Sequence, residues 1–329
     1  MILPILFLGA LIAAWTWAGL EIASPARRPL QDYHREFLDH PSGHGVKITA
    51  FRLSDQTPCL LMEPAPDGSL GKRGQVIREQ LHGQSVPLAN AGSILGNVVL
   101  VHGRNGRKED YLLIGERLCA VGFRCLLADM PAHGDHPVKV VTFGLREAYI
   151  PGLLLKEAAA KFGFSPQPAG LLGMSMGGAV AIHAAAQPDA FWKTLVVISS
   201  FDRLDLTLEN NVKRRVGQWL AALWLGGAEQ VYQWRTGIPI AEIRSDLPAS
   251  RLSLPVLMCH GTADRVVPMD SGLRLFASLN AKIEKQWLEV PGADHHNVLI
   301  TDFPIYATIA RWMLEHVASP ASPGSSQSR

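Results

Sequence analysis

One segment limits the folds open to this chain more than any other: Gly173-Met174-Ser175-Met176-Gly177-Gly178. A short apolar run, 169–172, precedes it, and small residues with helical spacing follow it at 178–186. This pattern predicts a tight turn between a buried strand and a helix, with Ser175 at its tip. A serine hydroxyl becomes a useful nucleophile when a base reaches one side and backbone donors the other. Ser175 is therefore the candidate nucleophile, and an inert Gly/Ser-rich buried turn is the alternative.

Strand-like and helical patterns alternate along most of the chain. Strands are expected at 46–52, 59–63, 97–101, 123–128, 170–174, 194–199, 255–260 and 284–290. Helices are expected at 111–120, 152–162, 178–187, 272–279 and 305–317. This order predicts an α/β protein with a doubly wound, mostly parallel sheet and helices on both faces. The alternation pauses at about 203–250, where a Trp-rich helical segment at 206–235 predicts a short lid over the carboxyl ends of the strands. No element is expected in 66–96.

Loops after two later strands carry an acid and a base. Asp264 lies in the loop 261–268, and His295 lies in the loop 291–297. Because the carboxyl ends of parallel strands meet at one edge of a sheet, both side chains are expected to reach Ser175. The chain order Ser, Asp, His is one of the known orders of a catalytic triad. Other residues leave alternatives open, namely His296 for the base, and for the acid either Asp294 beside the histidine or Asp202 after the strand 194–199.

With these motifs in register, residues 94–317 resemble an α/β-hydrolase. The short lid, the apolar amino terminus and Ile243-Arg244-Ser245-Asp246-Leu247 are most similar to the membrane-anchored, serine aminopeptidase-like hydrolases. The resemblance implies that the backbone N–H groups of Arg104, in the loop 102–106, and of Met176 form the oxyanion hole, and that His102 is structural. It implies a serine hydrolase that cleaves a carboxylic ester or thioester through an acyl-enzyme on Ser175. The alternatives are an aminopeptidase-like amidase and a non-catalytic binding protein with the same fold.

The amino terminus is strongly apolar. Residues 1–20 contain no charged side chain and are numerous enough to cross a bilayer. We therefore expect residues 1–22 to form an uncleaved transmembrane helix, because the exit 21–24 is a poor cleavage site; a cleaved signal peptide is the alternative. Three arginines that follow, Arg27, Arg28 and Arg35, favour a cytoplasmic location for the catalytic domain. Residues 23–45 are expected to form a polar stalk, 46–318 the hydrolase domain, and 319–329 a disordered tail.

Composition and motifs argue against several other functions. The 31 basic and 29 acidic residues nearly cancel and form no basic stripe, so no nucleic-acid partner is expected. No Gly-x-Gly-x-x-Gly follows a strand, so no nucleotide or redox cofactor is expected. The expected partners are a small-molecule acyl substrate, as the resemblance implies, and a membrane that residues 1–22 would enter. The run 132–136 resembles part of the ligand run of metallo-β-lactamase-like hydrolases, but Pro131 stands at the first ligand position, so no metal is expected. The four cysteines lack paired spacing and are expected to be buried free thiols, and the oligomeric state stays open.

Overall fold

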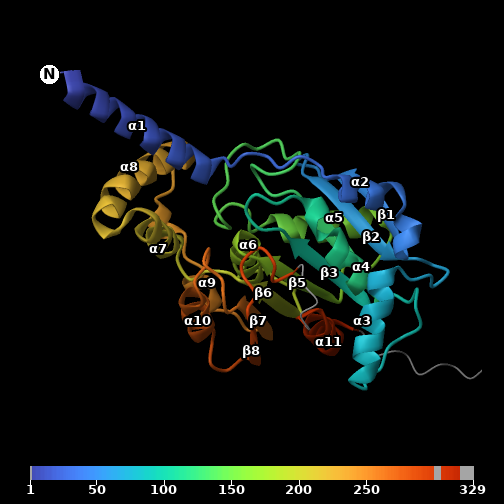
Figure 1. Cartoon of the computed structure of the whole chain (residues 1–329). Helices are drawn as coiled ribbons and strands as arrows, with labels where there is room; N and C mark the ends of the chain where they lie inside the picture. Colours follow the sequence, from blue (N-terminus) through green and yellow to red (C-terminus); the bar gives the residue numbers. More distant parts are fainter. Residues whose placement is uncertain (1, 300–304, 319–329) are drawn as a thin grey trace, which may run out of the picture.

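The structure is a computed structural model that describes residues 2–299 and 305–318. Eight strands form one sheet in the order β1-β2-β4-β3-β5-β6-β7-β8 (Figure 1). β1 pairs antiparallel with β2, and β2 with β4, whereas every later pair is parallel. The strands are β1 Val46–Arg52, β2 Pro58–Pro64, β3 Gly96–Val101, β4 Phe123–Ala128, β5 Ala169–Met174, β6 Thr194–Ile198, β7 Val256–Gly261 and β8 Lys285–Val290. The predicted mostly parallel sheet is confirmed.

Helices cover both faces of this sheet, which explains why its central strands are continuously apolar. In β3, Val99 and Val101 face one buried cluster, whereas Val98 and Leu100 face the other. The first cluster includes residues of α5 Ile150–Phe162, α6 Met176–Ala185 and α10 Met269–Ser278. The second includes residues of α3 Lys72–Gly83, α4 Leu112–Ala120 and α11 Ile305–Val317. A strand buried on both sides needs apolar residues at every position, as in parallel sheets.

Three segments differ from the sequence-based expectation. The stretch 66–96 contains α3, whose Ile77 and Leu81 are buried. The expected stalk 23–45 contains α2 Asp32–Asp39, whose Phe37 is buried and stacks on His44, so this segment packs on the domain. The lid is two helices, α7 Leu204–Val216 and α8 Gln218–Thr236, because Gly217 takes a φ of 84° that ends the first helix. Shorter helices are η1 Pro41–His44, η2 Lys108–Tyr111, η3 Ile240–Glu242 and α9 Asp246–Ala249. The expected tail 319–329 lies outside the described residues.

The amino-terminal helix α1 Ile2–Ala23 lies along the lid helix α8 (Figure 1). The Trp15 indole donates a hydrogen bond to the Leu223 carbonyl (2.9 Å), and a Cβ added at Gly19 would lie 2.5 Å from the Ala228 carbonyl oxygen. Among the described residues, no helix has the length and apolar character needed to cross a membrane, so the transmembrane helix expected for residues 1–22 is not shown. Near the carboxyl end of α1, Ala18, Ile22 and Ala23 are buried, whereas Trp17 is exposed. The cytoplasmic location stays a prediction.

Candidate active site

Ser175 occupies the turn between β5 and α6 with a φ of 54° and a ψ of −122°, a conformation that L-residues rarely adopt. The turn is tight, since a Cβ added at Gly173 would overlap the Gly177 carbonyl oxygen. Two hydrogen bonds hold the Ser175 backbone in place. Its N–H donates to the Ile198 carbonyl (2.9 Å), and its carbonyl accepts from the Ser200 hydroxyl (2.8 Å). The neighbouring strand β6 therefore fixes the strained turn that presents the hydroxyl.

The structure brings Ser175, His295 and Asp264 into one hydrogen-bonded chain. His295 Nε2 lies 3.0 Å from Ser175 Oγ, and His295 Nδ1 lies 2.7 Å from Asp264 Oδ2. Ser175, His295 and Asp264 are only 8%, 9% and 7% exposed, respectively, so little water competes for these contacts. Since a carboxylate can only accept, Nδ1 carries the proton and Nε2 is free to accept from the serine hydroxyl. This tautomer is the one a general base requires.

Asp264 is held in its ionised form by its surroundings. Burial raises the pKa of the carboxyl, but the hydrogen bond from His295, the electrostatic interaction with that imidazole and the Val267 N–H together hold the pKa below its ordinary value. Its second oxygen, Oδ1, accepts the N–H groups of Val266 and Val267 at 2.9 Å each. The loop after β7 thus fixes one carboxylate oxygen and leaves the other to His295.

The alternative residues are engaged elsewhere. Asp202 pairs with Arg274 (2.6 Å) and accepts from the Ser271 hydroxyl (2.5 Å). Asp294 caps its own turn by accepting the N–H of His296 at 2.8 Å, and His296 itself is exposed. The structure therefore brings Asp264 and His295 to the serine and leaves the three alternatives outside the chain of contacts.

The loop expected to form the oxyanion hole lies beside the serine. A Cβ added at Gly103 would lie 3.5 Å from the Ser175 Cβ. The Gly103 carbonyl accepts from the Gly106 N–H (3.1 Å) and faces His102 Nδ1 at 2.9 Å. Because the Met130 N–H donates to His102 Nε2 (3.0 Å), Nδ1 is the protonated nitrogen and donates to Gly103. These contacts fix the plane of the peptide whose N–H belongs to Arg104. The N–H of Met176 begins helix α6, directly after the serine, and the pairing of these two N–H groups as an oxyanion hole stays a prediction.

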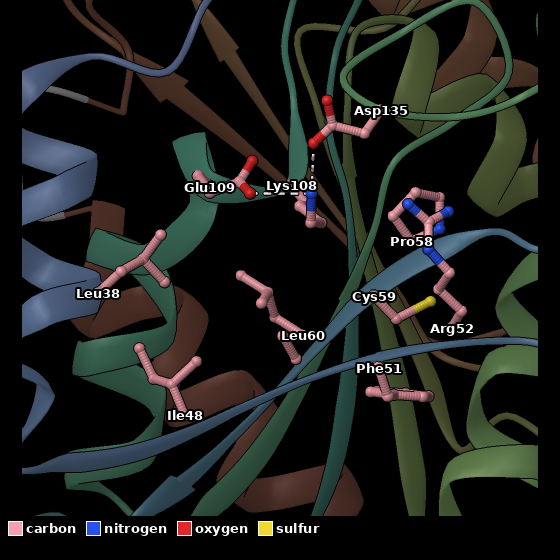
Figure 2. A pocket seen from close by; sticks show the side chains of 11 residues that line it. Leu38, Ile48, Phe51, Arg52, Pro58, Cys59, Leu60, Lys108, Glu109 and Asp135 are labelled. Carbon is pink, nitrogen blue, oxygen red and sulfur yellow. Dashed lines mark ion pairs between the residues drawn. The ribbon is translucent and has the colours of Figure 1, made fainter.

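Behind this loop, a cluster of buried charges joins the ends of β3 and β4. Lys108 donates to Asp129 through both its backbone N–H (2.9 Å) and its Nζ (2.8 Å), and Nζ also pairs with Glu109 (2.8 Å). A cavity of about 610 Å³ opens on the β1–β2 side of this cluster (Figure 2). Its apolar wall includes Leu38, Ile48, Phe51 and Leu60, and Lys108, Glu109 and Asp135 contribute charge. No triad residue lines it, and the sequence pattern gave no sign of the cluster, because Lys108 and Asp129 follow different strands and meet only in the folded sheet.

The other histidines and lid aromatics are placed as follows. His133 Nδ1 lies 2.8 Å from the Pro131 carbonyl, and His136 Nε2 lies 3.1 Å from the Thr57 hydroxyl. Across residues 2–299 and 305–318, no group of three or more His, Cys, Asp or Glu side chains is arranged to hold a metal ion.

The lid residue Tyr232 is buried and donates to the Val141 carbonyl, whereas Trp234 is 81% exposed. All four cysteines are buried and unpaired, as expected.

Comparisons with known proteins agree with this fold. The profile of the serine aminopeptidase S33 hydrolases matches residues 92–236, a range that contains Ser175 and the loop 102–106 but ends before Asp264 and His295. No curated protein sequence matches the chain.

Among solved structures, the Pyrococcus furiosus esterase Pf2001 is similar, with a TM-score of 0.59 and 16% identity over 89% of this chain and 99% of that one. An acylaminoacyl peptidase from Pyrococcus horikoshii has a TM-score of 0.59 and 14% identity over 90% of this chain, which spans 45% of the peptidase. At these identities the likeness concerns the fold. The eight-stranded sheet and these structures show that the chain has the α/β-hydrolase fold, and the S33 match over 92–236 agrees with it.

Proposed function

We propose that this protein is a serine hydrolase that cleaves a carboxylic ester or thioester through an acyl-enzyme on Ser175. The observation that carries the proposal is the chain of contacts from Ser175 Oγ to His295 Nε2 (3.0 Å) and from His295 Nδ1 to Asp264 Oδ2 (2.7 Å). His295 takes the serine proton as the hydroxyl attacks the substrate carbonyl, and Asp264 stabilises the imidazolium that forms. The proton then passes to the leaving group, and water releases the acyl group by the same steps in reverse.

The developing oxyanion is stabilised by the N–H groups of Arg104 and Met176. Removing one such donor typically costs about 2.7–4 kcal/mol of transition-state stabilisation. Esters, thioesters and amides share the same tetrahedral intermediate, so these residues fit all three substrates. The S33 match and the acylaminoacyl peptidase fold favour an amidase as the second candidate. The esterase neighbour supports the first.

A fluorophosphonate probe tests the proposal because it reacts with an activated serine. We expect the wild-type protein to be labelled and to hydrolyse p-nitrophenyl esters, and Ser175→Ala to lose both activities while keeping its circular dichroism spectrum. Acyl esters of graded chain length, acyl thioesters and aminoacyl p-nitroanilides then rank the substrate classes. Faster turnover of the anilides than of the esters would favour the amidase. Undiminished ester turnover by a folded Ser175→Ala would contradict the whole proposal.

A further inference from the structure

The last turn of α1 is bound to the loop beside the nucleophile. The Arg104 guanidinium donates to the Glu21 carbonyl oxygen at 2.6 Å and lies 3.3 Å from the Glu21 carboxylate. In a continuing helix that carbonyl would accept the N–H of residue 25, but residue 25 is proline and has none. Arg104 therefore satisfies an orphan carbonyl at a helix C-terminus, where a cation is also favoured by the helix dipole.

We propose that the Arg104 side chain is a positioning residue, through which α1 holds the oxyanion loop in its catalytic conformation. This inference rests on the proposed function, because it concerns the same N–H of Arg104. The backbone of Arg104 lies in the loop whose preceding residue, Gly103, packs against Ser175. The side chain of the same residue reaches away to α1. A shift of α1 would thus be transmitted to the peptide that faces the reacting carbonyl.

The end of α1 is a firm support for this contact. The Ala23 carbonyl accepts the N–H of Val141 (2.9 Å), and the Ser24 hydroxyl donates to the Lys139 carbonyl (2.6 Å). These bonds tie the helix end to the segment after β4, more than a hundred residues away in sequence. The partner of Arg104 is therefore fixed by the body of the domain.

The same helix also supports the lid. A Cβ added at Gly227 of α8 would overlap the Trp15 ring, so the two helices are in close contact at this point. Figure 1 shows α1 running along α8 at one end of the molecule. One helix thus contacts both the lid and the oxyanion loop, two parts of the site that are far apart in the chain.

The environment of Arg104 makes the contact sensitive to mutation. Its side chain is 29% exposed, and burial lowers the pKa of the guanidinium while the Glu21 carboxylate opposes that effect. Without Glu21, a partly desolvated cation would lose its charged partner. Substitution on either side is therefore expected to release the loop.

The test compares Arg104→Met, Arg104→Lys and Glu21→Gln with the matched control Arg124→Met. Arg124 pairs with Glu63 (2.9 Å) and is also half-buried, but it lies on β4 near the opposite end of the strands from the site. Rates of ester hydrolysis are divided by the number of sites titrated with fluorophosphonate. We expect Arg104→Met to lower kcat about tenfold, less than the 10²–10³ typical when an oxyanion donor is removed outright, with KM within about twofold. Arg104→Lys and Glu21→Gln should fall between Arg104→Met and wild type, and Arg124→Met should match wild type.

A purely structural role gives a different result. In that case Arg104→Met and Glu21→Gln would lower the thermal midpoint, yet kcat per titrated site would equal that of wild type, and the inference would be overturned. Ser175→Ala is measured in the same series to keep the two proposals separate. Turnover that survives Ser175→Ala would overturn both, whereas loss of turnover in Ser175→Ala with wild-type kcat in Arg104→Met would overturn only the role of α1.

Discussion

Replacing Asp264 by asparagine exchanges one carboxylate oxygen for an NH₂ group, and the structure determines which oxygen is exchanged. The carboxylate accepts two backbone N–H groups on Oδ1 and His295 Nδ1 on Oδ2. The new amide must keep its carbonyl oxygen on the two backbone N–H groups, because the opposite orientation would place its NH₂ donor against these two N–H donors. Its NH₂ group therefore points at His295 Nδ1 and donates to it. The imidazole must then carry its proton on Nε2, which faces Ser175 and can no longer accept from the hydroxyl.

A base held in the wrong tautomer loses most of its catalytic effect. We expect Asp264→Asn to lower kcat by about 10⁴, the usual size of this effect in serine hydrolases with the same geometry. At about 1.36 kcal/mol per factor of ten, this corresponds to roughly 5 kcal/mol of transition-state stabilisation. The assay is hydrolysis of a p-nitrophenyl ester between pH 6 and 9, with near-ultraviolet circular dichroism to show that the variant is folded.

Two aspartates provide controls for this change. Asp202→Asn and Asp294→Asn alter carboxylates that lie outside the chain of contacts, so both variants are expected to keep kcat within about threefold of wild type. Asp202→Asn should lose about 1 kcal/mol of stability because its partner Arg274 is half exposed. A folded Asp264→Asn that keeps at least a tenth of wild-type kcat would refute the assignment of the acid. A larger loss of kcat in Asp202→Asn than in Asp264→Asn would refute it as well.

Two further predictions follow from the histidines. In the same ester assay, His295→Ala should lower kcat by several orders of magnitude, whereas kcat of His296→Ala, a change at the exposed neighbour, should stay close to wild type. The reverse ranking would contradict the assignment of His295 as the base. Burial, followed by the electrostatic interaction with His102, lowers the pKa of His133 to about 3. Between pH 6.5 and 3 the unfolded chain therefore binds more protons at this residue, and the free energy of unfolding falls as the pH falls. Urea midpoints at pH 7 and 4.5 should therefore differ less in His133→Asn than in wild type, and an equal difference would exclude this contribution.

Local sequence was sufficient for the sheet and the nucleophile turn. The central strands were found because both of their faces are buried, so that every position is apolar. Ser175 was found because only glycine fits the close approach of Gly173 to Gly177, and this requirement is visible in the sequence. Helix α3 was missed although Ile77 and Leu81 lie four residues apart on its buried face. Its flanking polar and glycine residues dilute that pattern.

The tertiary structure decided what the pattern left open. His295 and His296 are adjacent in sequence, and only the path of the loop after β8 determines which imidazole lies 3.0 Å from Ser175. The apolar run at the amino terminus predicted a membrane span by its length, but its length could not show that Ala18 is buried and that Gly19 packs on Ala228 of α8, because apolar surface also leaves water by packing on protein. The contact between Glu21 and Arg104 joins residues 83 positions apart. Sequence periodicity records which side of an element is buried, but it carries no information about which distant residue covers that side, and this choice is made only when the whole chain packs.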